Sequence, residues 1–290
     1  MVYTFLKALS KIAPRLSLSV RCRLGDLLGR AVWPLVPRKR KKMAQTNIQL
    51  SLKLDQPESY AVAKASAVRF GRLLLEMLCL PGLTLNTLPQ LVSRIVGMEH
   101  LRQAQAAGRG VIVITAHSGN WELIGPALSL HGFPMVGVAL KQHNSAVDRF
   151  INECRTAAGM KIIYKTDVRS ILRTLADGAI VGLLIDQDAR QDGTFVDFFG
   201  RPASTPKGAA VMARMQNVPI VPLFIHSEAD GRHVIEIQEP IQMEKTADRE
   251  GDVQKMMQSL TGLVEDHIRS YPQEWFWLHN RWKTRLTEER

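Results

Sequence analysis

From about residue 110 onward, short apolar runs alternate with segments of helical periodicity, and this alternation constrains the fold more than any other feature. The apolar runs predict strands at Val111–Thr115, Met135–Leu140, Lys161–Tyr164, Ile180–Ile185, Val218–Ile225 and Val234–Gln238. Between them, the periodicity predicts helices near residues 120–130, 145–158, 167–176, 205–216 and 252–270. Such alternation is typical of an α/β domain with a largely parallel central sheet flanked by helices.

The N-terminal third is helical in pattern and lacks strand signals. Apolar residues recur at three- and four-residue spacing over residues 1–33, with a break or a second start at Pro14. Residues 59–80 predict another helix, which Pro81 and Gly82 end. Because no Pro- or Gly-rich linker follows, we predict a helical arm over residues 1–45 and one α/β domain over residues 46–290.

The net charge of +11 is concentrated at the N-terminus. Residues 1–54 hold 12 Lys or Arg side chains and a single acid, Asp26, so the remainder of the chain is neutral. Nucleic-acid binding over the folded domain would place basic residues there too, and we therefore predict no nucleic-acid partner. The three cysteines are widely scattered, which argues against a disulfide framework or a zinc site.

The basic arm admits several interpretations. Charged residues interrupt the apolar stretch that a secretory signal or a spanning helix needs. An amphipathic helix lying in the membrane interface would place its cations on anionic head groups. The alternative is a soluble helix packed on the core, with a solvated basic run at residues 38–42. The near-absence of acids favours the membrane interface, because soluble surface helices usually mix both signs.

The segment after the first predicted strand carries the strongest chemical signal. Val111–Thr115 leads directly to His117, and Ser118 or Asn120 is a suitable cap for the helix that follows. Glu122 would lie in the first turn of that helix, so it can meet His117 only if His117 precedes the helix. A carboxylate beside a histidine fixes its tautomer and prepares a general base. Alternatively, His117 is a turn residue and Glu122 an acid favoured by the helix dipole.

Two further segments stand out. Asp186 and Asp188 follow the apolar run Ile180–Ile185, where the ligands of parallel sheets bind. They suit substrate hydroxyls or the capping of a loop, and no additional ligand set supports a metal site. The tail has three tryptophans between residues 275 and 282, interleaved with cations. This pattern fits a lipid or phosphate interface, whereas Trp275 and Trp277 fit better as core residues.

Several enzyme classes are disfavoured, because the chain has no G-x-S-x-G, G-x-G-x-x-G, Walker A or H-E-x-x-H motif. A histidine base without an evident serine or cysteine nucleophile suggests direct transfer to a bound acceptor.

The segment His117-Ser118-Gly119-Asn120-Trp121-Glu122 resembles the H-x4-D/E motif of the lipid A biosynthesis lauroyl/myristoyl acyltransferase family, part of the glycerolphosphate acyltransferase-like superfamily. The tail from Trp277 to Arg285 is similar to that family's W-L-H-x-R-[FW]-K-T-R ending. Arg155 with Gly159, the Asp186 segment and the Phe-Phe-Gly-x-Pro loop follow in the family's order. The resemblance covers essentially the whole chain.

The resemblance implies a membrane-bound O-acyltransferase that moves a fatty acyl chain from an acyl carrier protein thioester to a hydroxyl of a lipid A precursor. It implies His117 as general base, Glu122 as its support, and no metal or other cofactor. Asn120 and Arg155 become candidates for positioning or for oxyanion stabilisation, and Asp186 and Asp188 for shaping the site or contacting the acceptor. The implied location is the cytoplasmic face of the inner membrane.

Two alternatives stay open from the sequence. An acyltransferase of the same superfamily could act on a glycerolipid or a glycosylated phospholipid. A non-enzymatic protein that binds membranes through its basic N-terminal arm is the other.

Overall fold

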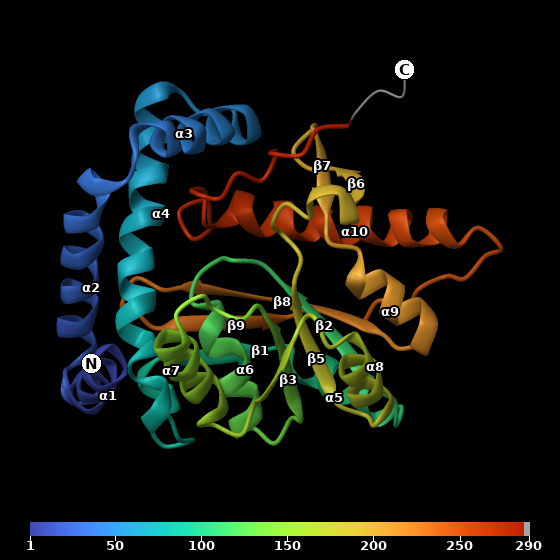
Figure 1. Cartoon of the computed structure of the whole chain (residues 1–290), viewed down its shortest axis with the longest axis horizontal. Helices are drawn as coiled ribbons and strands as arrows, with labels where there is room; N and C mark the ends of the chain where they lie inside the picture. The colour runs from blue at the N-terminus through green and yellow to red at the C-terminus, as the bar shows by residue number, and fades with distance from the viewer. Residues whose placement is uncertain (287–290) are drawn as a thin grey trace.

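A seven-stranded sheet organises the chain, whose computed structural model describes residues 1–286 (Figure 1). The strand order is β1-β9-β8-β2-β5-β3-β4. Every neighbouring pair is parallel except β8 and β9, which are antiparallel. The strands are β1 (Val92–Val96), β2 (Val111–Thr115), β3 (Met135–Ala139), β4 (Lys161–Tyr164), β5 (Ile180–Leu184), β8 (Ile220–Ser227) and β9 (His233–Ile237).

The predicted largely parallel α/β architecture is confirmed, and one strand of the large sheet escaped prediction. All five residues of the central strand β2 are buried, as expected for a strand covered on both faces. Strand β1 pairs with β9 alone and carries Ser93 and Arg94, which interrupt its apolar pattern. An edge strand tolerates such polar residues, so its hydrophobic signal is weak.

Helices cover both faces of the sheet. Alternate residues of β2 point to opposite sides: Ile112 and Ile114 join one hydrophobic core, and Val111 and Val113 join the other. Helices on the first side are α8 (Val168–Ala176), α9 (Gly208–Gln216) and α10 (Arg249–Ser270). Helices on the second side are α5 (Met98–Ala106), α6 (Trp121–Leu130) and α7 (Ser145–Thr156).

A small hairpin of β6 (Thr194–Asp197) and β7 (Pro202–Thr205) lies against α10. Its turn contains Phe199 and Gly200, both at positive φ. Phe198 is fully buried and stacks on Trp282 at 5.4 Å between ring centroids. The phenylalanines of this loop therefore belong to the core, the more frequent of the two roles considered from the sequence.

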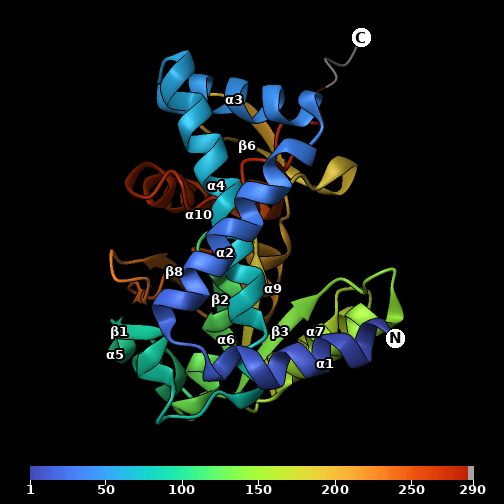
Figure 2. The ribbon, with the colours of Figure 1, turned by 90° about the vertical axis from the view of Figure 1, so that its left-hand side faces the viewer.

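The N-terminal helices form one side of the molecule. They are α1 (Val2–Ile12), α2 (Leu18–Val32), α3 (Arg38–Leu52) and α4 (Gln56–Met77). Pro14 separates α1 from α2, as its position in the pattern suggests. Figure 2 shows α1, α2 and α3 in front, with α4 behind α2. The predicted boundary after residue 45 lies inside α3, and the basic run at residues 38–42 forms the first turns of that helix.

Helix α2 packs closely on α4. A Cβ atom at Gly29 would lie 2.5 Å from the backbone of Val68, and one at Gly71 would lie 2.3 Å from the carbonyl oxygen of Gly25. Glycine at all three positions permits this separation. An ion pair between Arg72 and Asp26 crosses the same contact. In the described part of the chain, no helix has both the length and the apolar character needed to cross a membrane.

Candidate active site

The candidate site lies at the carboxyl ends of two neighbouring parallel strands. His117 follows β2, and Asp186 follows β5, the strand paired with β2 in parallel. His117 Nδ1 lies 2.8 Å from Asp186 Oδ1, and the backbone N–H of His117 donates to Asp186 Oδ2 at 2.9 Å. Parallel register thus brings together two residues that are 69 positions apart in the chain.

Asp186 is held as a carboxylate. Asp186 is buried, with only 3% of the residue exposed to solvent. Burial alone would raise the pKa of Asp186, but the charge of His117 and the hydrogen bonds from His117 and Trp275 outweigh burial and lower the pKa to about 2. Trp275 Nε1 donates to Asp186 Oδ2 at 2.7 Å. An ionised partner at Nδ1 places the imidazole proton there and leaves the Nε2 lone pair free to accept a proton.

The imidazole of His117 remains accessible, with 23% of its side chain exposed. No residue in the described part of the chain forms a hydrogen bond with its Nε2. The Trp121 ring meets it edge-on, with centroids 5.0 Å apart. His117 can therefore act as a base toward a group that approaches from the open side.

Glu122, which the spacing left either as a partner of His117 or as a helix-start acid, makes its side-chain contacts elsewhere in the structure. It lies in the first turn of α6 and accepts two hydrogen bonds from Arg155, from Nε at 2.7 Å and from Nη2 at 2.6 Å. Burial by itself would lower the pKa of Arg155, but the hydrogen bond and charge of Glu122 reverse this effect and raise it. The residue that orients His117 in the structure is Asp186. Sequence spacing could not reveal this contact, because it is made between the ends of two strands that are far apart in the chain.

Asn120 is turned away from the open side. It occupies the position before α6, yet its side chain makes no capping bond and donates instead to Glu76 Oε2 at 2.6 Å. Ser118, the other predicted cap, lies 2.9 Å from Nε2 of the buried His267. Both side chains are about 1% exposed and serve to fix the loop.

Asp188 holds the C-terminal tail. Its carboxylate accepts from the backbone N–H of Thr284 at 3.1 Å and from the Thr284 hydroxyl at 3.0 Å. Its own N–H donates to His279 Nε2 at 3.1 Å. The predicted shaping role fits these contacts.

The tail also clamps the histidine loop. Phe276 N–H donates to the carbonyl of His117 at 3.0 Å, and Gly119 N–H donates to the carbonyl of Glu274 at 3.1 Å. Trp275 and Trp277 are each 1% exposed, so both are core residues, as the sequence indicated. Trp275 has a second role that the sequence did not reveal, as a hydrogen-bond donor to Asp186.

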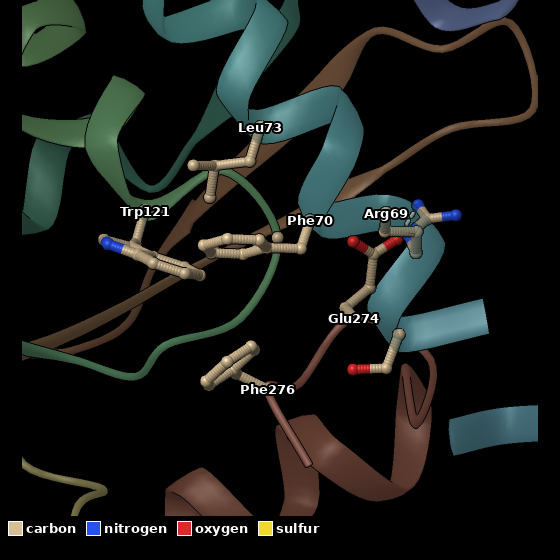
Figure 3. Close-up of a pocket in the computed structure, with 8 residues that line it drawn as sticks. Arg69, Phe70, Leu73, Trp121, Glu274 and Phe276 are labelled. Carbon is tan, nitrogen blue, oxygen red and sulfur yellow. Dashed lines mark hydrogen bonds and ion pairs between the residues drawn. The ribbon is translucent and has the colours of Figure 1, made fainter. Parts of the chain in front are cut away.

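A small pocket opens beside this loop (Figure 3). Phe70 stacks on Trp121 with centroids 6.3 Å apart and lies 5.2 Å from the Phe276 ring. The ion pair of Arg69 and Glu274 closes another side of the pocket. Burial, together with the charge of Arg72, lowers the pKa of Arg69 to about 10. The pocket thus combines an aromatic wall with one charged side and lies next to the ring that touches His117.

Sequence reasoning missed the α4 residues of the site. Helix α4 contributes Arg69, Phe70 and the fully enclosed Glu76. The signal for Glu76 in the sequence was its position as the single acid within the apolar run Leu73–Leu80, because an acid in such a run is buried with its apolar neighbours. In the described residues, no group of three or more His, Cys, Asp or Glu side chains is arranged to hold a metal ion.

The chain is similar to known acyltransferases. It is 29% identical over 235 residues to the phosphatidylinositol mannoside acyltransferase of Mycobacterium tuberculosis H37Rv, covering 78% of this chain and 72% of that protein. It is 27% identical over 195 residues to the lipid A biosynthesis lauroyltransferase of Escherichia coli K12, and the match covers 67% of this chain and 62% of that protein. The lipid A biosynthesis palmitoleoyltransferase of the same organism is 25% identical over 279 residues, and the match covers 93% of this chain and 87% of that protein.

The particular family follows from a match along nearly the whole chain. The profile of the bacterial lipid A biosynthesis acyltransferase family matches residues 2–284, and the chain belongs to that family. This agrees with the resemblance in the H-x4-E segment and the tail, and it makes the chain an acyltransferase rather than a binding protein alone. The 1-acyl-sn-glycerophosphate acyltransferase of Thermotoga maritima superposes with a TM-score of 0.40 at 15% identity, covering 87% of this chain and 98% of that one.

Proposed function

We propose that this acyltransferase moves a fatty acyl chain from an acyl carrier protein thioester to a hydroxyl of a lipid A precursor, with His117 as general base. The observation that supports this best is the His117–Asp186 pair, which leaves Nε2 free at the open side of the loop. Family membership supports the acyl transfer and the lipid acceptor.

In the proposed reaction, His117 Nε2 accepts the proton of the acceptor hydroxyl while that oxygen attacks the thioester carbonyl carbon. The carbon–sulfur bond then breaks, and the leaving thiolate takes the proton from the imidazolium. Asp186 stabilises the transient imidazolium and keeps Nε2 directed at the acceptor. The reaction restores the neutral imidazole at the end of each turnover.

Arg155 is the proposed donor to the developing oxyanion. Its Nε and Nη2 are engaged by Glu122, which fixes the guanidinium plane and leaves Nη1 as a further donor. Glu122 therefore acts through Arg155 in this proposal rather than through His117. Asn120 has a positioning role, because its amide is occupied by Glu76.

The acceptor has one serious competitor. The relatives with 29% identity are named phosphatidylinositol mannoside acyltransferases, so a glycosylated phospholipid is the second candidate acceptor. The reacting group would be an acyl-chain hydroxyl in the lipid A precursor and a hydroxyl of the glycosylated phospholipid in the alternative, and the same base chemistry serves either alcohol.

The proposed location is the cytoplasmic face of the inner membrane, with α1 and α2 lying in the interface. Helices α1 and α2 lie together on one side of the molecule (Figure 2). Both carry exposed apolar residues: Val2, Phe5, Ile12, Val20, Leu24, Leu27, Leu28 and Val32. Lys11, Arg23 and Arg30 are exposed on the same helices, and Arg15 is exposed on the short turn between them, where these cations suit anionic head groups. The basic start of α3 is the proposed attraction for the acidic carrier protein.

The test is an acyl-transfer assay with purified enzyme in mixed micelles, read by mass spectrometry of the lipid. Tetra-acylated lipid A precursor and a phosphatidylinositol mannoside are offered separately, each with acyl carrier protein thioester or with acyl-coenzyme A. The proposal expects a one-acyl mass gain on the lipid A precursor with the carrier protein donor. A gain restricted to the mannoside would replace the acceptor, and a gain only with coenzyme A would replace the donor.

A further inference from the structure

The end of α4 buries a carboxylate beneath the loop that carries His117. Glu76 is 2% exposed and lies in an otherwise apolar stretch of the helix. Its Oε2 accepts from Asn120 Nδ2 at 2.6 Å and lies 2.8 Å from His233 Nε2. Burial alone would raise the pKa of Glu76, but the charge of His233 and these two hydrogen bonds outweigh burial and lower it. An ionised carboxylate is thus enclosed here, and its Oε2 is engaged by two neighbours.

Further hydrogen bonds connect His233 back to the loop that carries His117. His233 Nδ1 lies 3.3 Å from the Ser227 hydroxyl, and that hydroxyl donates to Glu274 Oε2 at 3.4 Å. The carbonyl of Glu274 accepts from Gly119 N–H at 3.1 Å. The chain of hydrogen bonds therefore begins at the side chain of Asn120 and ends at the backbone of the preceding residue.

The loop needs this support because its backbone is constrained. Gly119 has φ +59°, and a Cβ there would lie 2.5 Å from the carbonyl oxygen of Ile225. His117 is two residues away, and its imidazole must keep both Asp186 and the acceptor in reach. Small displacements of a catalytic group lower the rate strongly, while substrate binding elsewhere is preserved.

Resting on the proposed acyl transfer, we propose that Glu76 is a positioning residue: its buried carboxylate, held by His233, fixes Asn120 and with it the loop that presents His117. Glu76 does not touch the reacting atoms. Its effect should therefore fall on kcat and not on KM.

The test moves the negative charge of the contact from residue 76 to residue 120. Asn120→Asp places a second carboxylate against Glu76, and we expect kcat to fall by about tenfold or more, with KM within about twofold. Glu76→Gln keeps an acceptor and should stay within about threefold of wild type. In Glu76→Gln/Asn120→Asp, the Gln amide donates to the new carboxylate, and most of the lost kcat should return. The matched control is Asp252→Asn, which removes another buried, ion-paired carboxylate, on α10, and should not rescue Asn120→Asp.

A second readout does not depend on turnover. The rate at which diethyl pyrocarbonate modifies His117, followed by peptide mass spectrometry, reports how the loop presents the imidazole. Asn120→Asp should change this rate, and the double variant should restore it. If the wild type transfers no acyl group, the proposed function fails while the His117 modification rates still decide the positioning role.

The proposal is overturned if the double variant is as impaired as Asn120→Asp in both kcat and modification rate. It is equally overturned if Asn120→Asp changes KM alone, since that would place Asn120 in contact with substrate. Should Asn120→Asp not fold by circular dichroism, Asn120→Ala and Glu76→Met take its place. Each should lower kcat, and their combination should be no worse than the more impaired single variant, because both remove one contact. Additive losses would contradict the proposal.

Discussion

Replacing Asp186 by Asn tests the heart of the site, because the exchange keeps the shape of the side chain and changes only its hydrogen-bonding capacity. Asp186 Oδ2 accepts from two fixed donors, the backbone N–H of His117 at 2.9 Å and Trp275 Nε1 at 2.7 Å. The amide oxygen of Asn must therefore occupy the Oδ2 position. Its NH2 group then points at His117 Nδ1.

The consequence is a change of tautomer. With an NH2 group 2.8 Å away in place of Oδ1, Nδ1 must become an acceptor, and the imidazole proton moves to Nε2. The lone pair that would take the proton of the acceptor hydroxyl is then lost. The equivalent exchange in the Ser-His-Asp triad lowers kcat about 10⁴-fold, and we expect a loss of roughly 10³ to 10⁴-fold here, which is about 4 to 5.5 kcal/mol of barrier.

The assay is steady-state acyl transfer, with KM measured for both substrates and the fold checked by circular dichroism. The account expects KM within about twofold of wild type, because Asp186 does not reach the substrate. Asp252→Asn serves as the control for removal of a buried carboxylate. An Asp186→Asn enzyme within about tenfold of wild-type kcat would refute the tautomer argument.

Three other predictions concern stability and the membrane. Burial lowers the pKa of His267 to about 3, so the unfolded state binds a proton at higher pH than the folded state does. The unfolding free energy should therefore fall by up to about 5 kcal/mol as the pH drops from about 6.5 to 3. Urea titrations of His267→Gln should lack this part of the pH dependence. Gly71→Ala should separate α2 from α4 and cost about 1–3 kcal/mol in thermal unfolding, whereas Gly262→Ala, with open space around its Cβ, should not destabilise; equal stability of the two variants would contradict the packing argument. For the proposed interface, Leu27→Glu should lower sedimentation with anionic vesicles by about tenfold or more, while the equally exposed Met215→Glu on α9 should leave it unchanged.

The sequence was most informative where local pattern and tertiary environment agree. The strands β2, β4 and β5 were found within one residue of their bounds, because each is a short apolar run closed by polar or turn residues. The edge strand β1 was missed for the opposite reason, since its apolar pattern is interrupted by the half-buried Ser93 and the exposed Arg94. Helix α3 was missed as an element because its first turns are a run of cations, which local pattern assigns to solvent.

The same distinction applies to the site. His117 was recognisable because the motif is contiguous, and its position at a strand end follows from the chain itself. Spacing left Glu122 as one of two interpretations, and the resemblance implied it as the partner of His117. In the structure, the strand order brings Asp186 to His117. Glu76 could not be found by spacing, since its contact with Asn120 depends on how α4 docks against the sheet.

The most direct test of the account is the mass of the lipid acceptor after incubation with acyl donor and either His117→Ala or His131→Ala. His131 lies at the far end of α6 from the site and controls for the loss of an imidazole. The account predicts a one-acyl mass gain with wild type and His131→Ala and none with His117→Ala. A gain that persists in folded His117→Ala would contradict the assignment of the base.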